Sequence, residues 1–217
     1  MSQNPGSHTD GSGADDERKP STLILASGSE GRLDTLRRAG LDPEVIVSGV
    51  DETVDETLPP AEQARVLAER KATAVADVLT GAGLVLGCDS MLELDGVVYG
   101  KPMSAETAAE RWRQQRGRTG ILHTGHCVID LESGKHATAT GSTMVRFADL
   151  TDAEIDAYVA TGEPLGVAGA FKTDGLGGAF VESIDGDYHN IVGVSLPLLR
   201  SLLGELGVAL PTLWKSI

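Results

Sequence analysis

Apolar runs alternate with amphipathic stretches through the first half of the chain. Apolar runs at 23–27 and 84–88 predict buried strands, and Val45–Val47 is a third apolar stretch. Residues 31–39 and 60–79 carry apolar side chains at helical spacing, the second stretch beginning at a Pro pair. Because buried strands that alternate with amphipathic helices are typical of α/β proteins, this half predicts a sheet flanked by helices.

The middle of the chain predicts antiparallel strands. Asp95-Gly96 is the dipeptide of a tight hairpin, and it separates the apolar segments 91–94 and 97–99. Farther on, segments 119–131 and 135–147 flank a short polar turn, which predicts a long hairpin.

The last third returns to helices. Thr151–Glu154 has the sequence of a capping box, which starts a helix that ends near Gly162. After a glycine-rich loop we expect a strand pair around Asp185-Gly186 and a final helix from Ser195 to about Glu205. The predicted fold class is α/β, with a mixed, strongly twisted sheet flanked by helices and two lobes around a central cleft.

Length and composition set the domain organisation. The 217 residues, 41% of them hydrophobic, are enough for one large core or two small ones. Residues 1–20 are rich in Gly, Ser, Asp and Asn and predict a disordered tail, which leaves 21–217 as a single domain. We find neither the apolar run of a signal peptide nor the ~20 apolar residues of a membrane span. With only two cysteines, Cys88 and Cys127, the composition predicts a soluble cytoplasmic protein without a membrane partner.

The charge balance is strongly acidic. Asp and Glu number 32 against 18 Lys and Arg, a formal net charge of −14. This argues against nucleic acid as a partner, because binding to a phosphate backbone needs a basic surface. Cations that bind a small phosphorylated ligand would have to gather in a cleft.

One turn has the chemistry of a phosphate site. Ser27 and Ser29 follow the first predicted strand, and Arg32 lies at the start of the next helix. A helix N-terminus offers unpaired N–H groups and a partial positive charge, and arginine binds phosphate through two donors. A serine before a helix is also the usual N-cap, so the turn alone leaves both interpretations open.

Acidic residues follow two of the apolar stretches. Asp89 comes directly after the predicted strand 84–88, at the end where ligands bind in open α/β sheets. It would hold a divalent cation or take a proton from water, or else it caps a turn. Asp51 or Glu52 would share the cation, although an acidic run such as 51–56 is usually a solvated loop.

Two lysines are placed to meet phosphates. Lys71 falls within the apolar stripe of the predicted helix 60–79, so it either reaches outward to water or projects into a cleft, and we favour the cleft. Lys101 precedes Pro102, which restricts it to extended backbone. A lysine at such a position is otherwise a surface turn residue.

The glycine-rich loop 168–178 carries a cluster of functional groups. Its glycines permit a close approach of the backbone to a ligand. Phe171 would stack on a base, while Lys172 and Asp174 would read the base edge or contact phosphates. The alternative, a plain connector, leaves this cluster unexplained.

Taken in order, these segments resemble the Maf family of nucleotide pyrophosphatases over about residues 22–209. The matching blocks are Leu25-Ala26-Ser27 with Arg32, Val50-Asp51-Glu52-Thr53, Ala68-Glu69-Arg70-Lys71-Ala72, Gly87-Cys88-Asp89-Ser90, Gly100-Lys101-Pro102, Ala157-Tyr158 with Thr161-Gly162-Glu163-Pro164, Ala168-Gly169-Ala170-Phe171, Gly175-Leu176-Gly177-Gly178 and Asp187-Tyr188-His189-Asn190-Ile191-Val192-Gly193. The resemblance implies a fold similar to the inosine triphosphate pyrophosphatases. It also implies an enzyme that hydrolyses a nucleoside triphosphate to a monophosphate and pyrophosphate.

The resemblance further implies roles for particular residues. Ser27 and Arg32 would hold the phosphates, and Lys71 and Lys101 would neutralise them.

Its remaining implications concern the metal, the base and the setting. Glu52 and Asp89 would place a Mg or Mn cation, with Asp89 also the general base on the attacking water. Lys172 and Asp174 would contact the substrate. The protein would be a cytoplasmic homodimer that clears non-standard nucleotides and is linked to cell-division arrest.

The chain departs from the family pattern at two places. The family often carries Ser-Pro-Arg-Arg where this chain has Ser29-Glu30-Gly31-Arg32, so one arginine is missing and a carboxylate is added. This motivates an alternative, a non-catalytic nucleotide-binding regulator of cell division. The segment 171–174 differs from the Tyr-Gly-Ile-Gln typical of the thymidine and uridine triphosphate branch. It is closer to the 7-methylguanosine triphosphate branch, which Ser90 and Met91 do not fit, so the base preference stays open.

Overall fold

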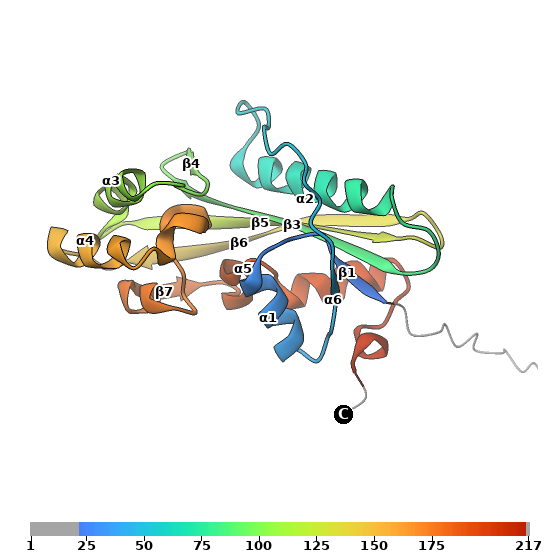
Figure 1. Ribbon diagram of the computed structural model, residues 1–217. Coiled ribbons are helices and arrows are strands. Elements are labelled where there is room, and N and C mark those ends of the chain that lie inside the picture. Colours follow the sequence, from blue (N-terminus) through green and yellow to red (C-terminus); the bar gives the residue numbers. More distant parts are fainter. Residues whose placement is uncertain (1–21, 216–217) are drawn as a thin grey trace, which may run out of the picture.

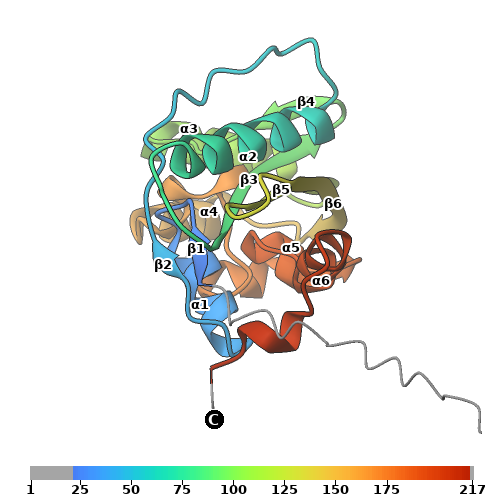
Figure 2. The ribbon, with the colours of Figure 1, turned by 90° about the vertical axis from the view of Figure 1, so that its right-hand side faces the viewer.

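The computed structural model describes residues 22–215. The predicted tail 1–20 therefore lies outside the described residues. Within the described range, no helix is both long and apolar enough to cross a membrane. Figures 1 and 2 show a sheet with helices packed on both of its faces.

The sheet of the described chain has seven strands in the order β2-β1-β3-β5-β6-β7, with β4 paired to the C-terminal part of β3. The strands are β1 (Leu23–Leu25), β2 (Glu44–Val45), β3 (Leu84–Leu94), β4 (Val97–Tyr99), β5 (Thr119–Asp130), β6 (His136–Phe147) and β7 (Val181–Asp185). β1 runs parallel to β2 and β3, and the other pairs are antiparallel. The predicted mixed α/β sheet is confirmed, as are the hairpins β3–β4 and β5–β6.

Helices cover both faces of this sheet. The helices are α1 (Glu30–Arg38), α2 (Pro60–Ala76), α3 (Ala105–Gln115), α4 (Asp152–Ala160), α5 (Tyr188–Val192) and α6 (Leu196–Glu205), with short 3₁₀ turns at 163–166, 168–170, 176–180 and 210–213. In Figure 1, α2 lies on one side of the sheet and α1, α5 and α6 lie on the other, with α3 and α4 near β4 and β7. The predicted capping box at Thr151 is confirmed, since its hydroxyl accepts from the Glu154 N–H and the Glu154 carboxylate accepts from the Thr151 N–H.

Two glycines on neighbouring strands let α2 lie directly against the sheet. A Cβ on Gly87 of β3 would come 2.2 Å from the Ala68 carbonyl oxygen, and one on Gly125 of β5 would come 2.2 Å from that of Ala64. Side chains alternate across a strand, so Asp89 points to the same face as Gly87, and its partner across the ladder is Gly125. Asp89 is therefore held close beneath α2, the helix that carries Lys71.

An aromatic cluster closes the end of the sheet near α3 and α4. The Trp112 ring of α3 meets the rings of Phe147, Tyr158 and Phe180 edge-on, with centroids 5.6, 5.6 and 5.9 Å away. Its indole Nε1 donates to the Ala170 carbonyl at 2.7 Å. This hydrogen bond attaches the start of the glycine-rich segment to the core.

Two sequence-based boundaries are wrong. The strand expected to end at residue 88 continues to Leu94, because residues 84–93 pair with β5 and residues 92–94 also pair with β4. Asp89 therefore lies inside β3 rather than beyond a strand end. The strand pair expected around Asp185-Gly186 is also wrong, since β7 ends at Asp185 and pairs with β6, and α5 follows directly.

Candidate active site

The eight predicted site residues line one cleft of about 600 Å³. They are Ser27, Arg32, Glu52, Lys71, Asp89, Lys101, Lys172 and Asp174. They come from the N-terminal turn of α1, the loop before α2, α2 itself, β3, the segment after β4 and the glycine-rich loop. The structure thus brings together side chains that are up to 147 positions apart in sequence.

Arg32 is buried at the start of α1, with 8% of the residue exposed. Its guanidinium donates from Nε to the Gly193 carbonyl at 2.8 Å, from Nη1 to Ser27 Oγ at 2.9 Å and from Nη2 to Ser90 Oγ at 3.0 Å. All three acceptors are neutral, and no carboxylate of the described residues forms an ion pair with Arg32. A buried charge without a partner is costly, so this cation favours an anionic ligand in the cleft.

The α1 N-terminus adds to this positive field. Ser29 is the N-cap, and its hydroxyl accepts from the Arg32 N–H at 3.4 Å. Ser27 Oγ accepts from the Ser29 N–H at 3.2 Å as well as from Arg32. The N-cap interpretation therefore holds for Ser29, and Ser27 instead orients the guanidinium beside the helix dipole.

Lys71 joins two carboxylates. It is 7% exposed, and its Nζ lies 2.5 Å from Asp89 Oδ1 and 2.7 Å from Glu52 Oε1. The prediction that Lys71 projects into a cleft rather than to the surface is confirmed. Burial would raise the pKa of Glu52, but the hydrogen bond and charge of Lys71, with Lys101 and Arg32, hold that pKa below its usual value.

Glu52 and Asp89, the two metal ligands expected from the sequence, lie close together in this cleft. The carboxylates of Glu52 and Asp89 contact one ammonium, so they converge on one small volume. No group of three His, Cys, Asp or Glu side chains that could hold a metal is found within 22–215. Mg²⁺ is commonly bound by one or two carboxylates together with substrate phosphates, and the donor set fits that mode.

The other predicted residues also line the cleft. Lys101 is exposed and has no side-chain hydrogen bond or ion pair among the described residues, so its ammonium is free to meet a ligand. Lys172 Nζ is 3.8 Å from Asp174 Oδ1, a loose ion pair at the limit of contact. Phe171 also lines the cleft, but it is only 4% exposed and its ring stands edge-on to Phe147, with centroids 5.0 Å apart, so most of the ring packs in the core.

The sequence did not single out two further groups in the site. Ser90 Oγ accepts from Arg32, and it also lies 3.0 Å from Thr124 Oγ1, which donates to the Asn190 carbonyl. Glu163 lines the cleft and accepts hydrogen bonds from the glycine-rich loop. The position of Ser90 beside Asp89 was the available signal for the first, and the Thr-Gly-Glu-Pro block was the signal for the second.

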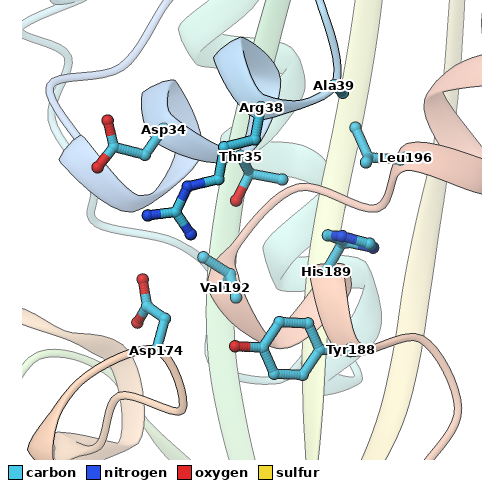
Figure 3. A pocket seen from close by; sticks show the side chains of 9 residues that line it. All are labelled: Asp34, Thr35, Arg38, Ala39, Asp174, Tyr188, His189, Val192 and Leu196. Atoms are coloured by element: carbon cyan, nitrogen blue, oxygen red, sulfur yellow. The ribbon is translucent and has the colours of Figure 1, made fainter.

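A smaller hollow of about 140 Å³ adjoins the cleft between α1, α5 and the start of α6 (Figure 3). Figure 3 shows Asp34, Thr35 and Arg38 of α1 on one side of the hollow and Tyr188 and His189 of α5 on the other. Asp174 lines both this hollow and the cleft. The glycine-rich loop therefore forms a wall shared by the two.

The family model and the curated relatives agree on one family. The family model described as Maf-like protein matches residues 22–206. A protein of Streptomyces avermitilis named nucleoside triphosphate pyrophosphatase is 58% identical over 194 residues, covering 88% of this chain and 94% of that protein. Proteins of the same name from Salinispora tropica and Thermosynechococcus vestitus are 52% and 51% identical, covering 90% and 87% of this chain and 88% and 95% of their own lengths. Among solved structures, the Staphylococcus aureus Ham1 protein aligns with a TM-score of 0.42 at 21% identity, covering 59% of this chain and 72% of that chain.

Proposed function

Because this chain belongs to the Maf family, we propose that it is a nucleoside triphosphate pyrophosphatase, a hydrolase that releases pyrophosphate and leaves a nucleoside monophosphate. The observation that carries the proposal is the buried guanidinium of Arg32, which has no carboxylate partner among the described residues and lies in the same cleft as the Lys71–Asp89 pair. Hydrolysis of a phosphoanhydride needs mainly fixed cations and an oriented water, and these side chains offer the cations and a carboxylate that would orient the water.

In this proposal the phosphates lie between the N-terminus of α1 and Lys101. Arg32, held by Ser27 and Ser90, faces the phosphate oxygens, and Lys101 is an exposed cation that lines the same cleft. Both kinds of group favour a polyphosphate over a neutral ligand. Glu30 also lines the cleft. The first turn of α1 therefore presents one arginine and one carboxylate, where the family often has two arginines.

Asp89 is proposed as the general base. The residue is 8% exposed, and its carboxylate accepts a hydrogen bond from Lys71, which fixes its direction. When a phosphate oxygen draws Lys71 away, Asp89 is left with a free lone pair that accepts a proton from water. The water then attacks phosphorus, the anhydride bond breaks, and pyrophosphate leaves with the electron pair.

Activity is further proposed to depend on a divalent cation. Glu52 and Asp89 are the residues that would hold it, and when bound it would neutralise charge that develops on the phosphate oxygens. Lys71 occupies the space between the two carboxylates, so it would move toward the substrate as the cation is held.

Glu30 supports a second candidate, a nucleotide-binding regulator without turnover. A carboxylate on the phosphate wall repels phosphate and would weaken the stabilisation of the transition state.

A panel of natural and modified nucleoside triphosphates, assayed with Mg²⁺, with Mn²⁺ and with EDTA, separates the two. The enzyme releases pyrophosphate and monophosphate in equal amounts from at least one nucleotide, and EDTA stops the release. The regulator binds a nucleotide in equilibrium dialysis and releases nothing from any member of the panel.

A further inference from the structure

Glu163 and Tyr158 hold one segment of the glycine-rich loop at both of its ends. The Glu163 carboxylate accepts the backbone N–H of Leu176 on Oε2 at 3.0 Å and that of Gly177 on Oε1 at 2.9 Å. The Tyr158 hydroxyl donates to Glu163 Oε1 at 2.9 Å and accepts the N–H of Lys172 at 3.3 Å. The segment 172–177 is therefore tied to α4 and to the turn that follows it.

Two glycines make this contact possible. A Cβ on Gly175 would lie 2.4 Å from Glu163 Oε2, and one on Gly177 would lie 2.4 Å from the Tyr158 hydroxyl and 2.7 Å from the Lys172 carbonyl. Neither glycine adopts a positive φ, so the close approach is the reason that a side chain is excluded there. The loop therefore needs glycine at positions 175 and 177 because its backbone packs directly on Glu163 and Tyr158.

The Glu163 carboxylate is hydrogen-bonded to the loop and forms no ion pair within residues 22–215. Burial would raise the pKa of Glu163, but the N–H groups of Gly177 and Leu176, the Tyr158 hydroxyl and the nearby charge of Lys172 hold it below its usual value. Tyr158 is itself fixed, 2% exposed, with its ring edge-on to Trp112 and Phe180. The clamp, defined as Glu163 with Tyr158, is therefore rigid on the side of the core.

Between the two tied ends lie Lys172 and Asp174, whose side chains line the cleft. Their side chains are only loosely paired with each other, at 3.8 Å, so their positions depend on the backbone of the loop. The geometry points to the clamp as the device that sets selectivity among nucleoside triphosphates, with Glu163 and Tyr158 as positioning residues that hold Lys172 and Asp174. This inference rests on the proposed pyrophosphatase function.

The clamp acts on selectivity, whereas the cations of the cleft act on the phosphates, and steady-state kinetics distinguishes the two roles. Loosening the loop should raise KM for the preferred nucleotide and spare kcat, because Arg32, Lys71 and Asp89 lie on other elements. The ratio of kcat/KM for the preferred nucleotide to kcat/KM for the others should fall roughly tenfold. This is the size expected when one hydrogen bond to a charged group is lost. Poorer substrates, which do not use the loop contacts, should change little.

The test compares Tyr158→Phe and Glu163→Gln with two matched controls, Tyr99→Phe and Glu182→Gln. The Tyr99 hydroxyl donates a hydrogen bond to Gln114 and the Glu182 carboxylate accepts one from Arg146, and neither Tyr99 nor Glu182 lines the cleft. Wild-type pyrophosphate release is measured first on the full panel of nucleotides, so a failure of the proposed function shows before any variant is made. Amide hydrogen exchange of residues 172–178 is then recorded for each protein that folds.

Support requires two results together in at least one clamp variant: faster exchange over 172–178, and a selectivity ratio lowered about tenfold with kcat within about twofold. The inference is overturned if folded clamp variants keep the wild-type ratio, if kcat falls equally for every nucleotide, or if exchange in the loop is unchanged. Tyr158→Phe keeps the packed ring, so it remains informative should Glu163→Gln fail to fold.

Discussion

Lys71 Nζ lies 2.5 Å from Asp89 Oδ1, and the two residues meet because α2 rests on glycines of the sheet. Gly87 precedes Asp89 by two positions on the same face of β3, and Gly125 is opposite Asp89 on β5. A bulkier pair of residues would lift α2 and separate the ammonium from the carboxylate. The position of the proposed base thus depends on backbone packing some distance from the ligand.

The charge of Lys71 is predicted to be needed for both catalysis and the ionisation of Glu52. In Lys71→Gln the positive charge that favours the carboxylate is lost, so the pKa of Glu52 rises from its lowered value. Turnover falls by roughly a hundredfold or more, since a cation at the phosphates is removed. NMR titration of Glu52 and steady-state kinetics measure the two effects, with the exposed Lys135→Gln as control. A Glu52 that titrates as in the wild type would contradict the assignment.

Arg32→Lys keeps the positive charge, but we expect it to lower kcat/KM strongly. The guanidinium uses three nitrogens on three acceptors, Gly193, Ser27 and Ser90, and an ammonium cannot reach all of them in that planar geometry. We expect kcat/KM to fall by about a hundredfold or more. Arg37→Lys, on an exposed part of the same helix, is the control and should leave kinetics unchanged. Equal kinetics for both variants would mean that Arg32 does not meet the phosphates.

Gly87→Ala should destabilise the fold through the close contact with α2. The added Cβ would come 2.2 Å from the Ala68 carbonyl and 2.7 Å from the Ala72 N–H nitrogen, both of them backbone atoms. We expect the free energy of unfolding to fall by about 1–3 kcal/mol, the range for overpacked cores, with activity reduced as well. Gly204→Ala is the matched control, because nothing lies within 4 Å of its Cβ and alanine favours the helix. Denaturant unfolding gives the free energy of unfolding of both variants, and equal values would contradict the tight contact between Gly87 and α2.

Stability is predicted to fall as the solution is acidified from pH 6.5 to 4. Burial lowers the pKa of His126 from 6.5 to about 4, and its Nε2 accepts the Ser195 N–H at 2.8 Å. Below pH 6.5 the unfolded chain binds a proton that the folded chain does not, so acid favours unfolding by up to roughly 3 kcal/mol. His126→Gln, whose amide oxygen can accept the same N–H, should remove this part of the pH dependence.

The control for this effect is the exposed His136→Gln. Unfolding free energies are measured between about pH 6.5 and 5.5, above the usual range of the carboxylates. If the wild type and His126→Gln show the same slope there, the buried imidazole is not the source.

Local patterns were sufficient for the helix-borne cations. Arg32 and Lys71 could be placed because a capping serine fixes the start of α1 and because the apolar stripe of α2 includes position 71. The β5–β6 hairpin was predictable for the same reason, since two long apolar segments flank a short polar turn.

The remaining features depend on contacts between distant segments. β3 continues through the polar pair Asp89-Ser90 because β5 pairs with residues 84–93, and no local sequence pattern shows this long-range pairing. The clamp role of Glu163 requires Leu176 and Gly177 to fold back onto it. The core position of Phe171 likewise follows from Phe147, 24 positions earlier in the chain.

The most direct test of the central claim is a product assay on wild type and Asp89→Asn with the best nucleoside triphosphate of the panel. Asp95→Asn, an exposed aspartate at the β3–β4 turn, is the matched control. The account predicts pyrophosphate and monophosphate in a one-to-one ratio from wild type and Asp95→Asn, and a rate at least about a thousandfold lower from Asp89→Asn. Release of orthophosphate by the wild type, or wild-type rates from folded Asp89→Asn, would contradict it.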